Sequence, residues 1–346
     1  MSNKNLANCE KCENCGGNLV FSPTHRALHC FNCGSNSEII VTNNFSKHPL
    51  DYKINQNNIN NWKNNNSVYV CQNCGGKVVL SNLELSKHCP YCNTSIVVKT
   101  ESMPELLPDQ IIPFKFDKTQ ANEQFKNGVK KKFFLPNKFK KSVPDSEITG
   151  FYGSAFSFDA DVFVRYHGQL YKDESDSQGR SYRRNISVSG SLNRNFRNMM
   201  IEATNQLTQS QFDKIAPFNL GGAVDYNDSF IRGYGTEYYN NSLQQSYSVV
   251  KYRVESQIDN AIVHKHFCDG VVRLHKDIKY SNERFSYLLF PVYKFNYKYK
   301  KKDYCTFVNG QTGKVGGGVP RSGAKIGFFV TGIVLGVLGI ILLALL

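Results

Sequence analysis

A repeated pattern of paired cysteines dominates the first hundred residues. Two Cys-x2-Cys pairs separated by fourteen residues occur twice, and each cysteine of the first copy recurs 59 positions later. One such copy offers four thiolates, the tetrahedral ligand set of a structural Zn²⁺ site with no open coordination position. The repeat therefore predicts two small zinc ribbons with one Zn²⁺ ion each, and the predicted ligands are Cys12, Cys15, Cys30, Cys33, Cys71, Cys74, Cys89 and Cys92.

Disulfide bonding is the alternative for these cysteines, and it requires an oxidising compartment. The segment from Met1 to Asn8 is polar and lacks the apolar stretch of a signal peptide. We therefore expect the ribbons to lie in the reducing cytosol and to bind zinc.

Other cysteines and histidines offer weaker metal patterns. Cys9 has no counterpart in the second copy, and we interpret it as a spare exposed thiol, with ligation in place of Cys12 as the alternative. His264, His266 and Cys268 alternate, so on a strand they would share one face. A metal site there is the alternative to our preferred interpretation, partly buried packing.

The pattern of the remaining chain predicts a multidomain protein. Residues 106–114, 148–171, 181–192, 271–280, 287–299 and 304–308 have the composition of strands. Asp117 with Gln120 predicts a capped helix to about Lys132, and apolar spacing predicts another over 241–264. Because helices and strands do not alternate regularly, we expect an α+β core with a mainly antiparallel sheet.

The sequence divides into five predicted parts. They are zinc ribbon 1 (1–45), an Asn-rich linker (46–66), zinc ribbon 2 (67–100), a cytosolic α+β domain (101–320) and a C-terminal transmembrane α-helix (326–346).

The segment 326–346 has 21 residues and no charged side chain. As a helix it would cover about 31 Å, the thickness of the hydrocarbon layer. A buried core helix is disfavoured because no residue supplies a polar face. Positive residues before the segment predict a single-pass cell-membrane protein with its N-terminal bulk in the cytoplasm, and we expect those nearest the membrane to contact anionic headgroups: Lys298, Lys300, Lys301, Lys302, Arg321 and Lys325.

Other basic clusters, at 130–132, 138–141 and 180–184, are spread along the chain, and we interpret them as ordinary solvated surface. Within the predicted anchor, Gly332 and Gly336 would permit close helix contact, so a homo-oligomer is an alternative to a monomer.

The formal charge of +14 invites a nucleic-acid partner. Two Zn²⁺ ions held by eight thiolates would lower that charge to about +10. Residues 1–100 hold nine Lys and Arg against five Asp and Glu, so the loaded ribbons would be close to neutral. Electrostatic attraction to nucleic acid through the ribbons should therefore be weak.

No catalytic motif is present in the sequence. The segment from Gly310 to Lys314 superficially resembles a phosphate-binding loop, but Val308 replaces the first glycine and Val315 replaces the required Ser or Thr. A hairpin turn at Asn309-Gly310 is the simpler interpretation. We predict no enzyme activity, no catalytic residues and no small-molecule substrate.

Several segments resemble a known family in the same order along the chain. They are Leu107–Phe114, Phe134–Pro136, Ile148–Tyr152, Pro217–Leu220, Ile231–Tyr234, Leu288–Tyr293 and Phe307–Val315. With the double ribbon, they resemble a bacterial family of zinc-ribbon membrane proteins of the YdjG type, whose members are often described as primosomal-helicase-like or TFIIB-type from the ribbons alone. One departure is that Gly153–Phe156 replaces a Pro-Phe-Trp-like run of the family.

The resemblance implies a membrane-bound, non-catalytic protein with the eight ribbon cysteines as zinc ligands. Some members of the family are linked to a phage-shock-type envelope-stress response and recruit cytosolic partners. The expected function is therefore a membrane-anchored, cytosol-facing adaptor for protein partners. A membrane-tethered nucleic-acid-binding protein is the first alternative, and an enzyme working through the central domain is the second.

Overall fold

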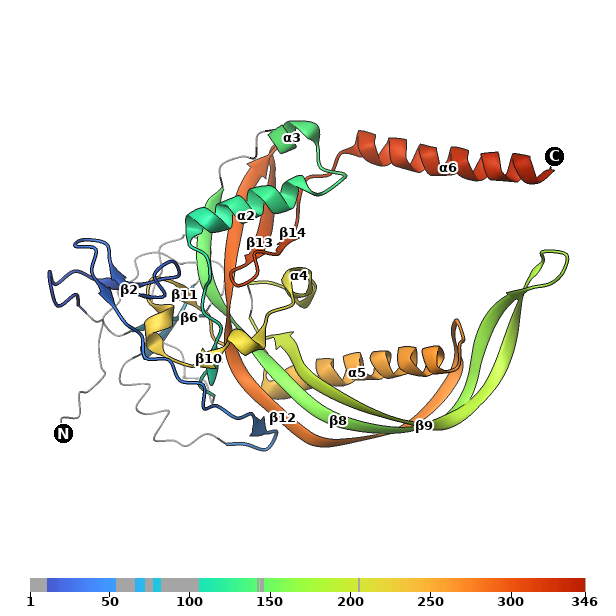
Figure 1. Ribbon diagram of the computed structural model, residues 1–346, viewed down its shortest axis with the longest axis horizontal. Helices are drawn as coiled ribbons and strands as arrows, with labels where there is room; N and C mark the ends of the chain where they lie inside the picture. Colours follow the sequence, from blue (N-terminus) through green and yellow to red (C-terminus); the bar gives the residue numbers. More distant parts are fainter. Residues whose placement is uncertain are drawn as a thin grey trace.

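Two long strands run the length of the molecule in the computed structural model, which describes residues 11–53, 66–71, 77–81, 106–141, 143, 146–204 and 206–345. Strands β8 (Glu147–Ser175) and β12 (Gly270–Tyr299) pair antiparallel along almost their whole length (Figure 1). The segments predicted at 271–280 and 287–299 are thus parts of one continuous strand. Register shifts at Phe158/Ala160 and at Ser281/Arg284 mark bulges, which increase local bending and twist.

The neighbours of this ladder differ along its length. Strand β9 (Ser181–Glu202) pairs with β8. The other edge of β12 pairs in turn with β4 (His48–Pro49), β7 (Gln110–Ile111) and β13 (Lys302–Asn309), and β14 (Val315–Gly317) pairs with β13. Most pairings are antiparallel, as predicted, but β7 with β12 and β11 (Gly235–Thr236) with β8 are parallel.

At one end both faces of the sheet are covered, and we call this end the body: Glu147–Phe158, Arg284–Tyr299 and the elements packed on them. Every residue from Phe151 to Phe158 is buried. One face packs on α2 (Lys118–Lys130), where Phe125 stacks on Phe295 with ring centroids 4.4 Å apart. The opposite face packs on α4 (Gln209–Ile215), where Phe212 contacts Phe290.

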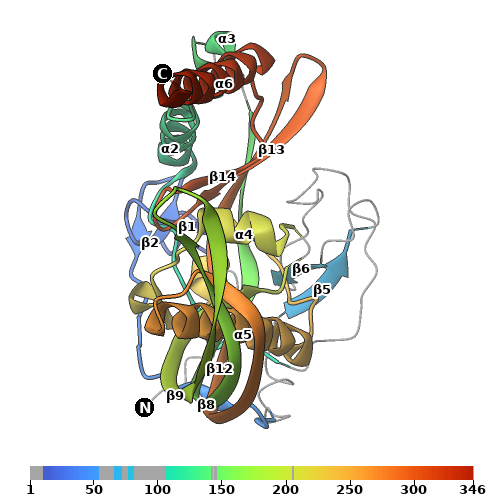
Figure 2. The ribbon, with the colours of Figure 1, turned by 90° about the vertical axis from the view of Figure 1, so that its right-hand side faces the viewer.

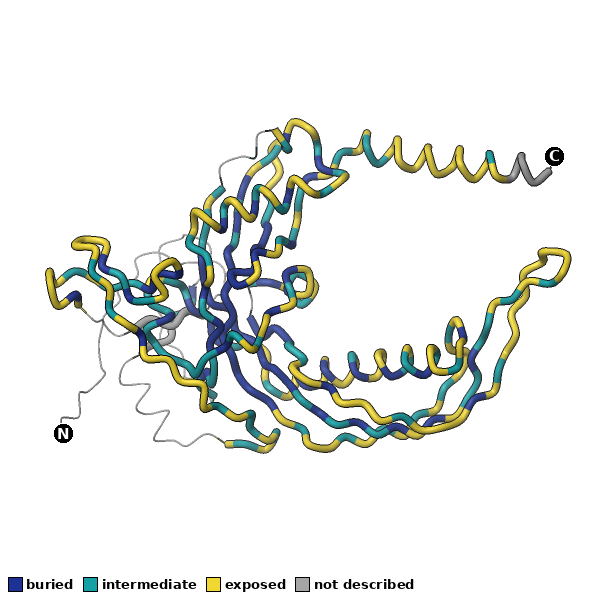
Figure 3. The backbone as a smooth tube through the Cα atoms, in the orientation of Figure 1, coloured by how far each residue is buried: buried dark blue, intermediate teal, exposed yellow. Residues whose placement is uncertain are grey.

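At the other end the three strands continue as a curved arm, comprising residues 160–196 and 243–283 (Figure 3). Burial alternates there, so that Ala160, Val162 and Val164 are buried while Arg165 is exposed. The buried face is covered by α5 (Leu243–Lys265), which packs through Val250, Val254, Ile258 and Ile262. The predicted helix at 241–264 is confirmed.

Local signals place the helix ends. Asp117 and Gln120 form the predicted capping box of α2, and Ser242 with Gln245 forms the same arrangement at α5. The short helix α3 (Asn137–Lys141) follows α2, and α6 (Gly323–Leu345) ends the chain. Small sheets complete the fold: β1 (Leu19–Ser22), β2 (Ala27–Cys30) and β3 (Asn36–Ser37) form one, and β5 (Asn66–Val70) with β6 (Lys77–Ser81) the other.

Candidate metal centre and membrane anchor

Two similar turns bring the first four cysteines together. Each turn has the form Cys-x-Asn-Cys-Gly, and the glycines, Gly16 and Gly34, have φ values of 70° and 77°. Glycine adopts this left-handed conformation without the strain that a Cβ would add. In each turn the glycine N–H donates to the carbonyl of the first cysteine at 2.8 Å, which closes the turn.

The four sulfurs form a compact cluster. The Sγ atoms of Cys12, Cys15, Cys30 and Cys33 all lie within 4.8 Å of one another. Cys12 Sγ lies 3.4 Å from Cys33 Sγ, and Cys15 Sγ lies 3.5 Å from Cys30 Sγ. Four thiolates about 2.3 Å from a tetrahedral Zn²⁺ would stand about 3.8 Å apart. Donor type, number and spacing therefore fit a single zinc ion.

Electrostatics within the cluster favour a bound cation. The Ser35 hydroxyl lies 3.0 Å from Cys12 Sγ and 2.9 Å from Cys33 Sγ, and this hydrogen bonding lowers the pKa of Cys12 to about 6. A backbone hydrogen bond with Gly17 opposes the effect at Cys15, but the neighbouring cysteine thiols raise the pKa of that side chain to about 12. Four thiols this close cannot all ionise easily alone, and a dication removes that obstacle.

The ribbon is fastened to the body through β1. Phe21 N donates to Arg232 O at 3.1 Å, and its ring packs edge-on against Phe230 with centroids 5.1 Å apart. Gly233 has a φ of 82°, and a Cβ at that position would lie 2.1 Å from Val20. Only glycine allows β1 to approach this closely, so the cysteine cluster has a fixed position on the body.

The second predicted ribbon is only partly within the described chain. Cys71 is buried and packs in the apolar cluster that contains Ile112 and Phe151. Cys74, Cys89 and Cys92 lie outside the described residues, as does Cys9. Within the part of the chain that the structure describes, the first four ribbon cysteines are the one group with metal-ligand geometry.

The chain after the first ribbon is held on the sheet by charged and polar contacts that the sequence did not reveal. Asp225 accepts hydrogen bonds from Thr42 Oγ1 at 2.6 Å and from the backbone of Asn44 and Phe45. This attachment lies just before the predicted linker, and it directs the following residues toward β8.

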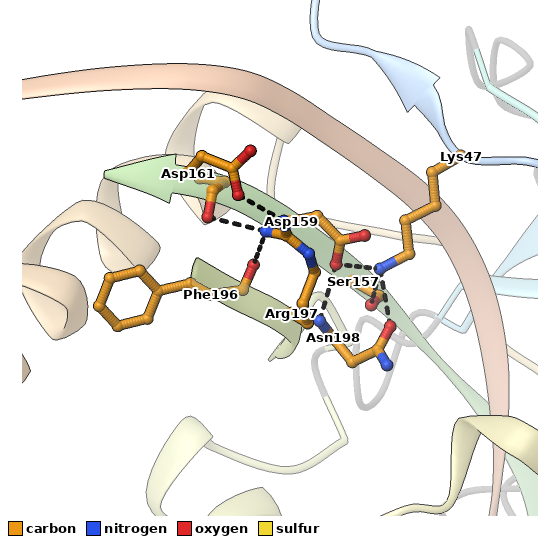
Figure 4. Close-up of polar contacts among 8 residues, drawn as sticks. Lys47, Ser157, Asp159, Asp161, Phe196, Arg197 and Asn198 are labelled. Carbon is orange, nitrogen blue, oxygen red and sulfur yellow. Dashed lines mark hydrogen bonds and ion pairs between the residues drawn. The ribbon is translucent and has the colours of Figure 1, made fainter. Parts of the chain in front are cut away.

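Lys47 forms the centre of a polar clamp at the bulge of β8 (Figure 4). Its ammonium donates to Ser157 Oγ at 3.0 Å, to Asp159 at 2.6 Å and to Asn198 Oδ1 at 2.9 Å. Burial lowers the pKa of Lys47, and the Asp159 carboxylate counteracts this effect. Nearby, Arg197 donates to the carbonyls of Ala160 and Phe196 and pairs with Asp161. The clamp connects three distant segments and has the character of a structural fastening.

Helix α6 is long and apolar enough to cross a membrane. An 18-residue window from Gly323 to Ile340 has a mean hydropathy of 1.9, and none of it is buried inside the protein. Side chains such as Phe328, Leu335 and Ile340 are 63–81% exposed. A soluble core helix would bury such residues, so this helix fits a membrane anchor.

The predicted membrane-proximal residues lie near the start of α6. Lys325 Nζ donates to Leu135 O at 2.9 Å. Lys300 and Lys301 form the turn between β12 and β13, and they are exposed, as are Lys298 in β12 and Lys302 at the start of β13. Arg321 is exposed two residues before α6.

Two further features of the sequence, the segment Asn309–Lys314 and the group His264, His266 and Cys268, have defined places in the structure. Asn309 is buried, and its Nδ2 donates to Ile215 O at 2.9 Å while its Oδ1 accepts from Gln311 N. The Asn-Gly-Gln-Thr-Gly-Lys segment is thus a turn that fastens β13 to the end of α4, consistent with the hairpin interpretation. The strand face considered for His264, His266 and Cys268 does not form, because α5 continues to Lys265 and His266 caps it. Cys268 is buried and His266 is half-buried against Tyr166, in keeping with the preferred interpretation of partly buried packing.

A buried carboxylate cluster at the end of β9 was not anticipated. Thr204 N donates to Glu202 Oε2 at 3.0 Å, Thr204 Oγ1 donates to Glu237, and Asn240 donates to the Glu237 carboxylate as well. Burial raises the pKa of Glu202 to about 7. No spacing along the sequence signals this cluster, since its members come from β9 and from the segment after β11.

Comparison with known proteins identifies a distant homologue. The chain is 24% identical over 331 residues to an uncharacterized protein, YdjG, of Bacillus subtilis, and the match covers 93% of each chain. No family model matches the chain. No solved structure matches it either.

Proposed function

We propose that this protein is a non-catalytic adaptor that α6 anchors in the cell membrane and whose zinc ribbons and body recruit protein partners on the cytoplasmic side. The observation that carries the proposal is the combination of a closed four-cysteine cluster and a long apolar helix whose membrane-length window, Gly323 to Ile340, contains no buried residue. A closed four-thiolate shell stabilises a small fold and leaves no position for a reacting water. The resemblance to YdjG-type proteins supports the same function and suggests a role in envelope stress.

Zinc content is the first test. The full-length protein, purified in detergent, is expected to contain two tightly held Zn²⁺ ions, one for each cysteine set. Cys12→Ser with Cys15→Ser should remove one ion, because two thiolates cannot complete a tetrahedral shell. Cys305→Ser is the matched control, since that half-buried cysteine lies outside the cluster. Metal analysis that finds no zinc in the wild type would contradict the proposal.

Partner recruitment is the second test. Membranes carrying tagged wild-type protein, the Cys12→Ser/Cys15→Ser variant or Cys305→Ser would be solubilised, and bound proteins would be identified by mass spectrometry. The adaptor function predicts partners that the double variant loses and the control retains. A chain that ends after Arg321 should appear in the soluble fraction.

The nucleic-acid alternative has a distinct outcome. Within the described part of ribbon 1, residues 11–45, Lys11 and Arg26 are balanced by Glu13 and Glu38. Lys47, in the segment that follows, is paired with Asp159. Strong binding of DNA or RNA with a steep salt dependence would favour that alternative over a protein adaptor.

A further inference from the structure

The start of α6 is clasped by the loop that follows α2. Ser322 N donates to Phe134 O at 2.8 Å, and Lys325 Nζ donates to Leu135 O at 2.9 Å. The ring of Phe329 packs edge-on against Phe134 with centroids 5.5 Å apart. These contacts hold the first turn of α6 beside residues 131–135, about 190 positions earlier in the chain.

Helix α3 extends this contact to the turn between β12 and β13. Phe139 is buried on α3, and its ring lies 5.1 Å from Tyr299 and 5.6 Å from Tyr297. Both views of the molecule place α3, the start of α6 and the β12–β13 turn at the same end (Figures 1 and 2). We call residues 130–141, 298–302 and 321–325 the collar.

The collar is strongly cationic. None of its residues is acidic. It contains twelve cationic residues: Lys130, Lys131, Lys132, Lys138, Lys140, Lys141, Lys298, Lys300, Lys301, Lys302, Arg321 and Lys325. Asp303 borders it and lies 3.7 Å from Lys298. Burial, together with the charges of Lys214 and Arg321, lowers the pKa of Lys132. Like charges gathered at one end of the molecule repel each other. An anionic surface that faces them offsets this repulsion.

An exposed aromatic side chain stands among these charges. Phe133 is 66% exposed, and its ring centroid lies 6.3 Å from that of Phe329 on α6. Cationic and aromatic side chains around the end of an apolar helix are typical of the membrane–water interface. The same combination is unusual on a surface that faces only water.

The arm determines on which side a bilayer can lie. It extends in the same direction as α6 (Figure 1), and its tip carries Asp173, Glu174, Arg183 and Arg184. Such charged groups do not enter hydrocarbon. A bilayer that holds α6 must therefore leave the tip of the arm in water, and the hydrogen bonds at Ser322 and Lys325 keep the collar next to the point where the helix enters.

We propose that the collar binds the anionic phospholipid headgroups of the bilayer that α6 enters, with Phe133 at the boundary of the acyl chains. Lys131, Lys138, Lys140 and Lys141, far from the anchor in sequence, thus join Lys300–Lys302 in holding the body against the membrane. This inference rests on the proposed membrane anchoring, and it adds a fixed orientation of the body on the bilayer. Adaptor surfaces such as the ribbon would then stand at a defined position relative to the membrane.

Lipid-specific quenching of a tryptophan reporter tests this arrangement. Full-length protein with Phe133→Trp and Trp62→Phe would be reconstituted in vesicles containing about 30% phosphatidylglycerol in phosphatidylcholine. Bromine on the acyl chains of either lipid quenches only a nearby indole. We expect the tryptophan fluorescence of the Phe133→Trp protein to fall at least twofold in vesicles with brominated lipid. The quenching should be about twofold stronger with brominated phosphatidylglycerol than with an equal fraction of brominated phosphatidylcholine.

Two controls complete the experiment. Tyr252→Trp, combined with the same Trp62→Phe change, places the reporter on α5 at a side chain that is 75% exposed, and it should show less than about 10% quenching. Adding Lys138→Gln, Lys140→Gln and Lys141→Gln to the Phe133→Trp protein should abolish the preference for phosphatidylglycerol.

Flotation of the vesicles separates the two possible failures. If the protein floats with the lipid but Phe133→Trp is quenched no more than Tyr252→Trp, the collar proposal is overturned and the anchor stands. Protein that does not float overturns both. Equal quenching by the two brominated lipids would overturn the binding of anionic headgroups.

Discussion

The body and the arm use the same two strands in different ways. In the body β8 and β12 have strands on both sides and helices on both faces, so consecutive side chains from Phe151 to Phe158 are all buried. In the arm the sheet narrows to three strands with α5 on one face, and burial alternates from residue to residue. One continuous ladder therefore changes from a two-faced core to a one-faced amphipathic sheet at its bulges.

The same difference governs the carboxyl groups. Burial raises the pKa of Glu202 at the body end of β9 to about 7. At the arm tip, hydrogen bonding from Arg184 lowers the pKa of Glu174, which is half-buried beside its more exposed partner. The body thus disfavours charge, whereas the arm carries it in exposed pairs. This comparison predicts which substitutions destabilise the whole fold and which have only a local effect on stability.

The largest effect is expected for Phe156→Ala in the body. This fully buried ring contacts Tyr239, Phe285 and Tyr287, so its loss leaves a cavity on the central strand. The free energy of unfolding should fall by about 3–5 kcal/mol. Denaturant unfolding in detergent would measure it, and hydrogen exchange should accelerate in both body and arm. Acceleration confined to the arm would contradict the distinction.

A smaller and more local effect is expected for Ile258→Ala in the arm. Ile258 is fully buried between α5 and the sheet, and its truncation should cost about 2–4 kcal/mol. Because the arm is only three strands wide and α5 covers one of its faces, the loss should appear as faster hydrogen exchange throughout the arm, residues 160–196 and 243–283. The body should keep its protection, and exchange that rises equally in α2 would show that the two regions unfold as one.

The pH dependence of Glu202 sharpens the electrostatic difference. Its folded pKa of about 7 exceeds the ordinary value of 4.5, so the native state holds the proton more tightly than the unfolded chain does. The stabilisation that the protonated Glu202 side chain gives the folded state is complete below about pH 4.5. It is lost as the pH rises to about 7, because the folded protein then releases the proton. With partial access to water, we expect a loss of about 1–3 kcal/mol over this range.

Glu202→Gln should remove that dependence, because the amide stays neutral and its oxygen can still accept from Thr204 N. Thermal unfolding at pH 5 and pH 8 would measure the difference between wild type and variant. A variant with the same loss of stability as the wild type between these pH values would assign the dependence to another group.

The smallest effect is expected for Glu174→Gln at the arm tip. Its partner Arg184 is more than half exposed, and exposed ion pairs contribute little to stability. The midpoint of unfolding should be unchanged within error at pH 7. A measurable loss of stability would indicate that the tip is packed more tightly than its exposure suggests.

Local patterns in the sequence predicted the elements that depend on neighbouring residues. Cys-x2-Cys-Gly spacing identified the four cysteines of the first cluster, because each turn is set by a few consecutive residues. The capping box at Asp117 and the apolar periodicity of α5 are local in the same sense. The helix α6 follows from an uninterrupted apolar run.

Contacts between distant segments escaped that reasoning. Lys47 and Asp159 stand 112 positions apart, and nothing near either residue indicates the other. The separate strands expected at 148–171, 271–280 and 287–299 became two strands of 29 and 30 residues, because pairing between them continues through bulges that the sequence does not mark.

The sequence by itself determined the four cysteines of the first cluster, the capping box of α2 and the apolar helix α6, since spacing between nearby residues sets each of them. The tertiary structure alone decided where the ladder has two covered faces and where it has one. It also gathered basic clusters that look scattered along the chain into the collar beside α6. The physical reason is that burial and charge density depend on which surfaces meet, and residues nearly two hundred positions apart meet there.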